Sequence, residues 1–125
     1  MKVAIVGSRN WPNFQQVRDY VMVLPAGTEV VSGGAPGVDA AAEGAARYRW
    51  YRCKDVPQPT VFRADWSRFG RSAGPRRNAQ MVEYADRVVA FWDGKSPGTK
   101  HTIGLAKKAG KPVEIITPDG VVSEK

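Results

Sequence analysis

Two patterns of hydrophobic and polar positions alternate along the chain. Short apolar runs favour buried strands, whereas apolar residues three or four positions apart favour helices with one buried face. Five strand segments, each followed by a helix or a turn, predict an α/β fold with a mainly parallel sheet. We therefore expect a Rossmann-like, three-layer α/β/α sandwich with five strands, at residues 3–6, 29–32, 60–62, 87–92 and 113–116.

The predicted helices lie between these strands. The helical spacing of Phe14, Val17, Val21 and Leu24 predicts a first helix that ends before Pro25. Residues 64–74 are rich in polar residues and glycine and are expected to form a loop. The other helices are expected at residues 38–52, 75–85 and 98–109, in a single domain over residues 1–117 with a frayed tail at 118–125.

A glycine-rich turn connects the second predicted strand to the helix that begins near Val38. Gly33, Gly34 and Gly37 permit positive φ and let an anion approach the backbone closely. The start of a helix offers unpaired N–H groups and a partial positive charge. Phosphate or a phosphorylated sugar is the ligand that suits such a turn, and a tight turn without a ligand is the alternative. Neither the dinucleotide-binding pattern G-x-G-x-x-G nor the P-loop pattern is present.

Polar residues and glycines follow the predicted strands. Because ligands of open parallel sheets lie beyond the carboxyl ends of the strands, these segments are expected to meet around one ligand. They are Gly7-Ser8-Arg9, Ser32-Gly33-Gly34, Asp65-Trp66, and residues 93–99 with Asp93, Gly94, Gly98 and Thr99.

The net charge of +7 favours anionic partners, with simple solubility as the alternative. Five arginines, at positions 63, 68, 71, 76 and 77, lie within fifteen residues of one another. With one cysteine, Cys53, and one histidine, His101, neither an internal disulfide nor a structural zinc site can form. Without a signal peptide or an apolar run of membrane-spanning length, we expect a cytoplasmic protein with no membrane partner, no metal and no cofactor.

Four ordered motifs resemble the SLOG superfamily, which includes lonely-guy phosphoribohydrolases, Smf/DprA DNA-processing proteins and small nucleotide-sensor domains. In detail the chain is most similar to the small stand-alone YspA-type branch found in phages and bacteria, over about residues 3–116. The motifs are Gly7-Ser8-Arg9, residues 32–39, residues 73–81, and Phe91-Trp92-Asp93-Gly94 with Pro97-Gly98-Thr99.

This resemblance implies a nucleotide-derived ligand. Gly98-Thr99 would seat a phosphate on a helix N-terminus, and Gly33, Gly34 and Gly37 would pack against ribose or a second phosphate. Arg77 matches the arginine that works at the N-glycosidic bond in lonely-guy enzymes, and Asp39 and Asn78 would fix ribose hydroxyls. The expected ligand-binding residues are Gly7, Ser8, Arg9, Ser32, Gly33, Gly34, Gly37, Asp39, Asp65, Trp66, Arg77, Asn78, Asp93, Gly94, Ser96, Gly98 and Thr99.

One position departs from the enzyme pattern G-G-x-G-T-x-x-E. Thr102 stands where the catalytic glutamate belongs, and threonine cannot act as the acid or base. We therefore expect binding or sensing of a nucleotide-derived small molecule. A nucleotide N-glycosidase with Arg77 and Asp39 as catalytic residues is one alternative. A DprA-like protein that binds single-stranded DNA through its arginines is the other.

Aromatic residues suggest two further interactions. Trp66 and Trp92 follow strands and are candidates for stacking on a base, with packing in the core as the alternative. Tyr48, Trp50 and Tyr51 lie on the outer side of a predicted helix, which would expose them in a monomer. Together with the resemblance, this aromatic cluster predicts a homodimer.

Overall fold

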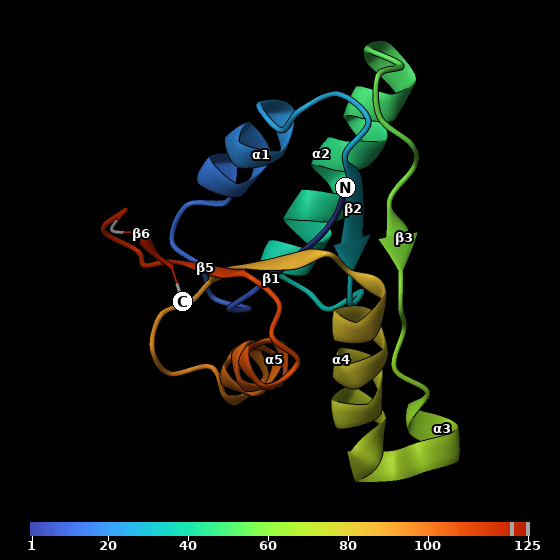
Figure 1. Ribbon diagram of the computed structural model, residues 1–125, viewed down its shortest axis with the longest axis vertical. Coiled ribbons are helices and arrows are strands. Elements are labelled where there is room, and N and C mark those ends of the chain that lie inside the picture. Colours follow the sequence, from blue (N-terminus) through green and yellow to red (C-terminus); the bar gives the residue numbers. More distant parts are fainter. Residues whose placement is uncertain (121, 125) are drawn as a thin grey trace.

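The computed structural model describes residues 1–120 and 122–124 of the 125-residue chain (Figure 1). Its sheet has the order β3-β2-β1-β4-β5-β6. The strands are β1 (Lys2–Gly7), β2 (Glu29–Ser32), β3 (Thr60–Val61), β4 (Arg87–Phe91), β5 (Val113–Ile116) and β6 (Val122–Glu124). The helices are α1 (Phe14–Met22), α2 (Val38–Arg52), α3 (Trp66–Phe69), α4 (Ala73–Tyr84) and α5 (Pro97–Lys108), with a 3₁₀ turn at Gly70–Ser72.

Helices cover both faces of the sheet (Figure 1). Successive residues of a strand point to opposite faces, so β1 contributes to two cores. Val3 and Ile5 pack with residues of α1 and α2, whereas Ala4 and Val6 pack with residues of α4 and α5. The three-layer α/β/α arrangement confirms the predicted fold class, as does the parallel pairing among the five strands from β1 through β5.

The strand order reverses between β1 and β4. From β1 the chain builds β2 and β3 on one side, then crosses to β4 and β5 on the other. Gly7, the last residue of β1, lies opposite Phe91, the last residue of β4. A Cβ on Gly7 would lie 2.5 Å from the Phe91 carbonyl oxygen and 2.7 Å from Cγ2 of Val38. Glycine therefore lets β1, β4 and the start of α2 meet at the edge where ligands of such sheets bind.

The segment expected to be a loop at residues 64–74 is instead largely helical. It forms α3 and the 3₁₀ turn, and α4 begins at Ala73, two residues before the predicted start. Asp65 stabilises α3, because its Oδ1 accepts hydrogen bonds from the N–H of Arg68 at 3.2 Å and the hydroxyl of Ser67 at 2.9 Å. Such local capping forms a short helix without the apolar periodicity that predicts a longer one.

The tail expected from residue 118 on contains a strand. After a turn in which the N–H of Gly120 donates to the carbonyl of Thr117, β6 pairs antiparallel with β5. A strand of three residues is too short for its alternation to stand out in the sequence. The sheet therefore consists of five parallel strands and one antiparallel edge strand.

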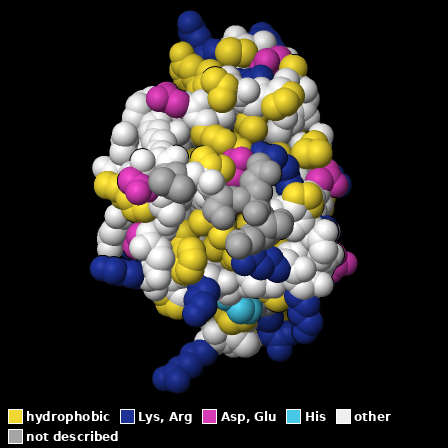
Figure 2. Space-filling model, turned by 60° about the vertical axis from the view of Figure 1, so that its left-hand side comes forward, with side chains coloured by type: hydrophobic (Ala, Val, Ile, Leu, Met, Phe, Trp, Pro, Cys, Tyr) yellow, Lys and Arg dark blue, Asp and Glu magenta, His cyan; other side chains and the backbone are white. Residues whose placement is uncertain are grey.

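Exposed aromatic and basic side chains share the end of α2. Tyr48, Trp50 and Tyr51 have exposed fractions of 58%, 39% and 68%. Arg47, Arg52 and Lys54 are exposed beside them in the sequence, and we call these six residues the α2 end patch. Figure 2 shows hydrophobic and basic side chains together at the upper end of the molecule, where α2 ends in Figure 1.

No helix in the described ranges, 1–120 and 122–124, is long and apolar enough to cross a membrane.

Candidate functional site

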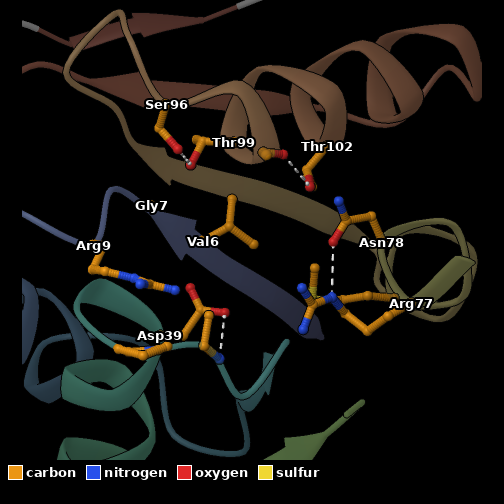
Figure 3. Close-up of a pocket in the computed structure, with 13 residues that line it drawn as sticks. Val6, Gly7, Arg9, Asp39, Arg77, Asn78, Ser96, Thr99 and Thr102 are labelled. Atoms are coloured by element: carbon orange, nitrogen blue, oxygen red, sulfur yellow. Dashed lines mark hydrogen bonds between the residues drawn. The ribbon is translucent and has the colours of Figure 1, made fainter. Parts of the chain in front are cut away.

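The carboxyl edge of the sheet holds a cavity with a volume of about 190 Å³, which we call the loop pocket (Figure 3). Its walls come from the end of β1, the turn between β2 and α2, one side of α4 and the first turns of α5. The lining residues are Val6, Gly7, Arg9, Ala35, Pro36, Asp39, Arg77, Asn78, Met81, Ser96, Gly98, Thr99 and Thr102.

Arg9 reaches the loop pocket from the connection between β1 and α1. Gly37 fixes this connection, because a Cβ on Gly37 would lie 2.6 Å from both Cα and the carbonyl oxygen of Arg9. Gly37 also has φ +88°, which glycine adopts without strain. Figure 3 shows the Arg9 side chain extended toward Asp39. Its guanidinium forms no hydrogen bond or ion pair within the described part of the chain, so its donors are free for an anion.

Asp39 lies in the first turn of α2 and is only 5% exposed. Its Oδ2 accepts hydrogen bonds from the N–H groups of Gly33 at 3.2 Å and Ala35 at 3.4 Å. Burial raises the pKa of this carboxyl group to about 7, against the opposing effects of the two N–H groups and of the Arg77 charge. Asp39 can therefore gain or lose a proton near neutral pH.

Arg77 and Asn78 reach the loop pocket from α4. Nη1 of Arg77 donates to the carbonyl oxygen of Gly33, and its Nε donates to Oδ1 of Asn78 at 2.9 Å. Asn78 is buried, with its Nδ2 3.3 Å from Nδ1 of His101. The half-buried Arg77 thus joins α4 to the glycine-rich turn and places a positive charge beside Asp39.

The start of α5 forms the opposite wall. Asp93 shapes the preceding loop, since its Oδ1 accepts hydrogen bonds from the N–H groups of Lys95 at 2.8 Å and Ser96 at 2.9 Å. These hydrogen bonds lower the pKa of Asp93, so it stays ionised. The hydroxyls of Ser96 and Thr99 lie 3.1 Å apart on the pocket side (Figure 3). The first turn of α5 adds N–H groups that have no partner inside the helix.

Thr102 lies one turn further along α5 and also lines the loop pocket. Its hydroxyl donates to the carbonyl oxygen of Gly98 at 3.2 Å, so it is engaged with its own helix. Among the described lining residues, Asp39 is the one that carries a carboxyl group, and it lies on the other side of the pocket from Thr102 (Figure 3). With two arginines and one titratable carboxyl group, the lining suits an anion. No cluster of three His, Cys, Asp or Glu residues that could hold a metal occurs among the described residues.

The structure brings eight of the expected ligand-binding residues to the loop pocket: Gly7, Arg9, Asp39, Arg77, Asn78, Ser96, Gly98 and Thr99. Seven others lie in the chain segments next to lining residues and do not line the pocket themselves: Ser8, Ser32, Gly33, Gly34, Gly37, Asp93 and Gly94. Ser8 and Asp93 are linked, because the N–H of Asp93 donates to the Ser8 hydroxyl at 3.2 Å.

Trp66 and Trp92, the two tryptophans expected to stack on a base, are not part of the lining. Trp66 lies on α3 with 60% of its surface exposed, and its ring packs over Gly74. Trp92 is half-buried, and its Nε1 donates to the carbonyl oxygen of Ser96 at 3.1 Å. Asp65 caps α3 and also lies outside the lining.

Five lining residues were not among the expected ones. Met81 belongs to the α4 motif and could have been selected on that ground, and Thr102 was considered only as a replaced glutamate. Ala35 and Pro36 belong to the motif at residues 32–39 and could have been selected in the same way. Val6 lines the pocket only through its position near the end of β1, and an apolar strand residue carries no sequence signal for a ligand.

No model of a known protein family matches the sequence. The gene 61 protein of Mycobacterium phage D29 is 39% identical to it over 119 residues, which cover 90% of this chain and 93% of the phage protein. The chain belongs to the family of this phage protein. Membership of the YspA-type branch stays a prediction.

Among solved structures, the chain is similar to DNA processing protein A from Helicobacter pylori, described for its single-stranded DNA binding mode. The TM-score is 0.63 at 24% sequence identity, and the match covers 93% of this chain and 65% of that one. The chain therefore spans just under two thirds of the length of that protein. The likeness shows a shared fold and agrees with the expected resemblance to the Smf/DprA proteins.

Proposed function

We propose that the loop pocket binds the phosphate of a nucleotide or nucleotide-derived small molecule, and that the protein acts as a sensor, sequestering or regulatory domain. The observation that carries this proposal is the convergence of Arg9, Arg77 and the first turn of α5 on one cavity at the point where the strand order reverses. Open α/β sheets bind their ligands at that point.

The phosphate would lie against the first turn of α5. There it would accept hydrogen bonds from backbone N–H groups and from the hydroxyls of Ser96 and Thr99. Arg9 would add a charge-assisted hydrogen bond from the opposite side. Protonation of Asp39 would remove the one negative charge from the lining and so favour the bound anion.

Single-stranded DNA is the second candidate ligand. It is favoured by the fold shared with DNA processing protein A and by the exposed arginines Arg63, Arg68, Arg71 and Arg76. Two of these, Arg68 and Arg76, lie over the ring of Phe69 at 4.9 and 4.4 Å from its centroid. Binding along such a surface would weaken steeply with salt, because each phosphate contact releases a counterion.

Hydrolysis of an N-glycosidic bond is the remaining alternative. Asp39, with a pKa of about 7 in a cavity, is a candidate acid or base. Arg77 would stabilise the negative charge that develops on the leaving base. Release of free base over time from a nucleoside monophosphate, abolished in Asp39→Asn, would support this alternative.

A thermal-shift screen in high salt tests the proposal. The probes are nucleoside monophosphates, ADP-ribose, cyclic nucleotides and a short single-stranded oligonucleotide. A ligand at 100 times its Kd stabilises by about 2.7 kcal/mol, which raises Tm by roughly 8–15 °C for a domain of this size. Oligonucleotide binding at low salt without any response to small nucleotides would instead support the second candidate.

Two matched variants place the ligand. Gly98→Asp introduces a carboxylate at the pocket end of α5 and should abolish the thermal shift. Gly104→Asp introduces the same side chain into the same helix outside the loop pocket, where a Cβ meets nothing within 4 Å, and should leave the shift unchanged. A shift that survives in Gly98→Asp would contradict the proposed phosphate position.

A further inference from the structure

The loop pocket is too small for a whole nucleotide. Its volume of about 190 Å³ lies below the roughly 300–1,000 Å³ that is typical of pockets for small-molecule ligands. A phosphate and its sugar match the smaller volume, and a base needs further space. Any nucleotide held there must therefore extend beyond the loop pocket.

A wider hollow adjoins it. This second hollow, which we call the α1–α2 hollow, has a volume of about 460 Å³. Arg9 and Pro36 line both cavities, so the two are adjacent at the Arg9 side chain. The next residue of the turn, Gly37, lines the α1–α2 hollow and packs directly on the Arg9 backbone.

The lining of the α1–α2 hollow suits a flat ring. Ala40, Ala41 and Gly44 of α2 form a floor of small residues, and a Cβ on Gly44 would meet nothing within 4 Å. Phe14 at the start of α1 is half-buried and adds an aromatic side chain. An aromatic side chain offers a sequence-tolerant stacking surface for a base, and the small residues of α2 leave space for the base beside it.

Two arginines line the α1–α2 hollow. Arg9 lies at the junction with the loop pocket, and Arg18 lies one turn beyond Phe14 on α1. Arg18 is exposed, and the one hydrogen bond that the described structure gives its guanidinium is a long one of 3.4 Å to Gln15. No carboxylate occurs among the lining residues that the structure describes, so the surroundings of Arg18 also suit an anion.

We propose that the ligand carries two phosphates on either side of one nucleoside and spans both cavities. The first phosphate occupies the loop pocket, the base lies against Phe14 and the floor of α2, and the second phosphate binds Arg18. This inference rests on the proposed function and specifies its ligand class. Both a free nucleoside bisphosphate and the phosphorylated 5′ end of a single strand have this chemistry.

Titration calorimetry with graded probes tests the inference on the full chain. The probes are ribose 5-phosphate, adenosine 5′-monophosphate, adenosine 3′,5′-bisphosphate and a 5′-phosphorylated single-stranded tetranucleotide. Gly44→Leu fills the floor and should weaken both adenosine ligands about tenfold or more, while ribose 5-phosphate binds as before. Gly104→Leu, the same change at a helical glycine outside both cavities, is the control.

Arg18→Gln separates the second phosphate from the base. It should weaken the bisphosphate about tenfold and leave the monophosphate unchanged, because only the bisphosphate reaches Arg18. A tetranucleotide that binds more tightly than the bisphosphate, with the same response to both variants, would identify the strand end as the source.

Two outcomes would overturn the inference and are distinct from each other. If Gly44→Leu and Arg18→Gln bind the bisphosphate as the wild type does, while Gly98→Asp loses it, the loop pocket acts alone and the proposed function stands. If no probe, including ribose 5-phosphate, binds the wild type, the proposed function fails together with the inference.

Discussion

The carboxylate of Asp39 accepts a hydrogen bond from the backbone N–H of Gly33 at 3.2 Å. The backbone carbonyl of Gly33 accepts a hydrogen bond from Arg77. Side chains of α2 and α4 therefore hold both backbone polar groups of Gly33. A segment whose glycines leave it intrinsically flexible is thereby fixed before any ligand arrives. The two side chains that fix it also line the loop pocket, so the site and the support of its wall are the same residues.

The first prediction concerns the stability of the fold against pH. The pKa of Asp39 is about 7 in the folded protein and near its ordinary value of 3.8 when unfolded. Between these values the folded state binds a proton that the unfolded state has lost, so the free energy of unfolding falls as the pH rises. Asp39→Asn lacks this titration. Urea unfolding from about pH 5 to pH 8 should show the wild type losing stability relative to Asp39→Asn. Parallel profiles of stability against pH for the two proteins would contradict the raised pKa of Asp39.

The second prediction concerns ligand binding against pH. Ionisation of Asp39 places a negative charge in the lining, so the affinity for a phosphate ligand should fall between about pH 6 and pH 8. The phosphate itself titrates near pH 6, which would alter affinity in the same range. Asp39→Asn is the control, because the ratio of its affinity to that of the wild type cancels the titration of the ligand. A ratio independent of pH would show that Asp39 keeps one charge state throughout.

Much of the fold could be predicted from the sequence because its central strands are buried on both faces. Continuous apolar runs such as residues 88–91 have few alternatives, and the observed strands lie within a residue or so of the predicted ones. The short elements α3 and β6 could not be predicted, since they depend on a capping side chain and on pairing with β5. Local contacts of this kind leave no period in the sequence.

The candidate site could be predicted only in part. Glycines and polar residues after β1 and β4 indicated the edge of the sheet at which the loop pocket lies, because parallel topology brings strand ends together. The burial of Asp39 and the anchoring of Arg77 on Gly33 depend on how α2 and α4 pack. The α1–α2 hollow is defined by small residues such as Ala40 and Gly44, whose role is to leave space. Small residues of this kind form no sequence motif, so the hollow could not be predicted from the sequence.

The third prediction concerns Gly7. Gly7→Ala would bring its Cβ to 2.5 Å from the Phe91 carbonyl oxygen and 2.7 Å from Cγ2 of Val38, and neither backbone nor a buried valine can yield easily. Overpacking of this kind typically costs about 1–3 kcal/mol, which urea unfolding would measure. Gly104→Ala is the matched control, since it lies inside α5 with open space around it and should gain about 0.5–1 kcal/mol. Equal effects of the two variants would contradict the close approach of β1 and β4.

The fourth prediction concerns the homodimer, which would form through the α2 end patch. Tyr48, Trp50 and Tyr51 offer exposed apolar surface, but each copy also brings Arg47, Arg52 and Lys54 to the interface. Like charges repel and salt screens them, so a dimer held by this patch should become stronger as the salt concentration rises. Light scattering at low and high salt measures the effect. Tyr51→Ser should shift the equilibrium toward the monomer, whereas Trp66→Ser, which alters an exposed aromatic residue on α3, should not. A dimer that weakens with salt, or that is equally sensitive to both variants, would place the interface elsewhere.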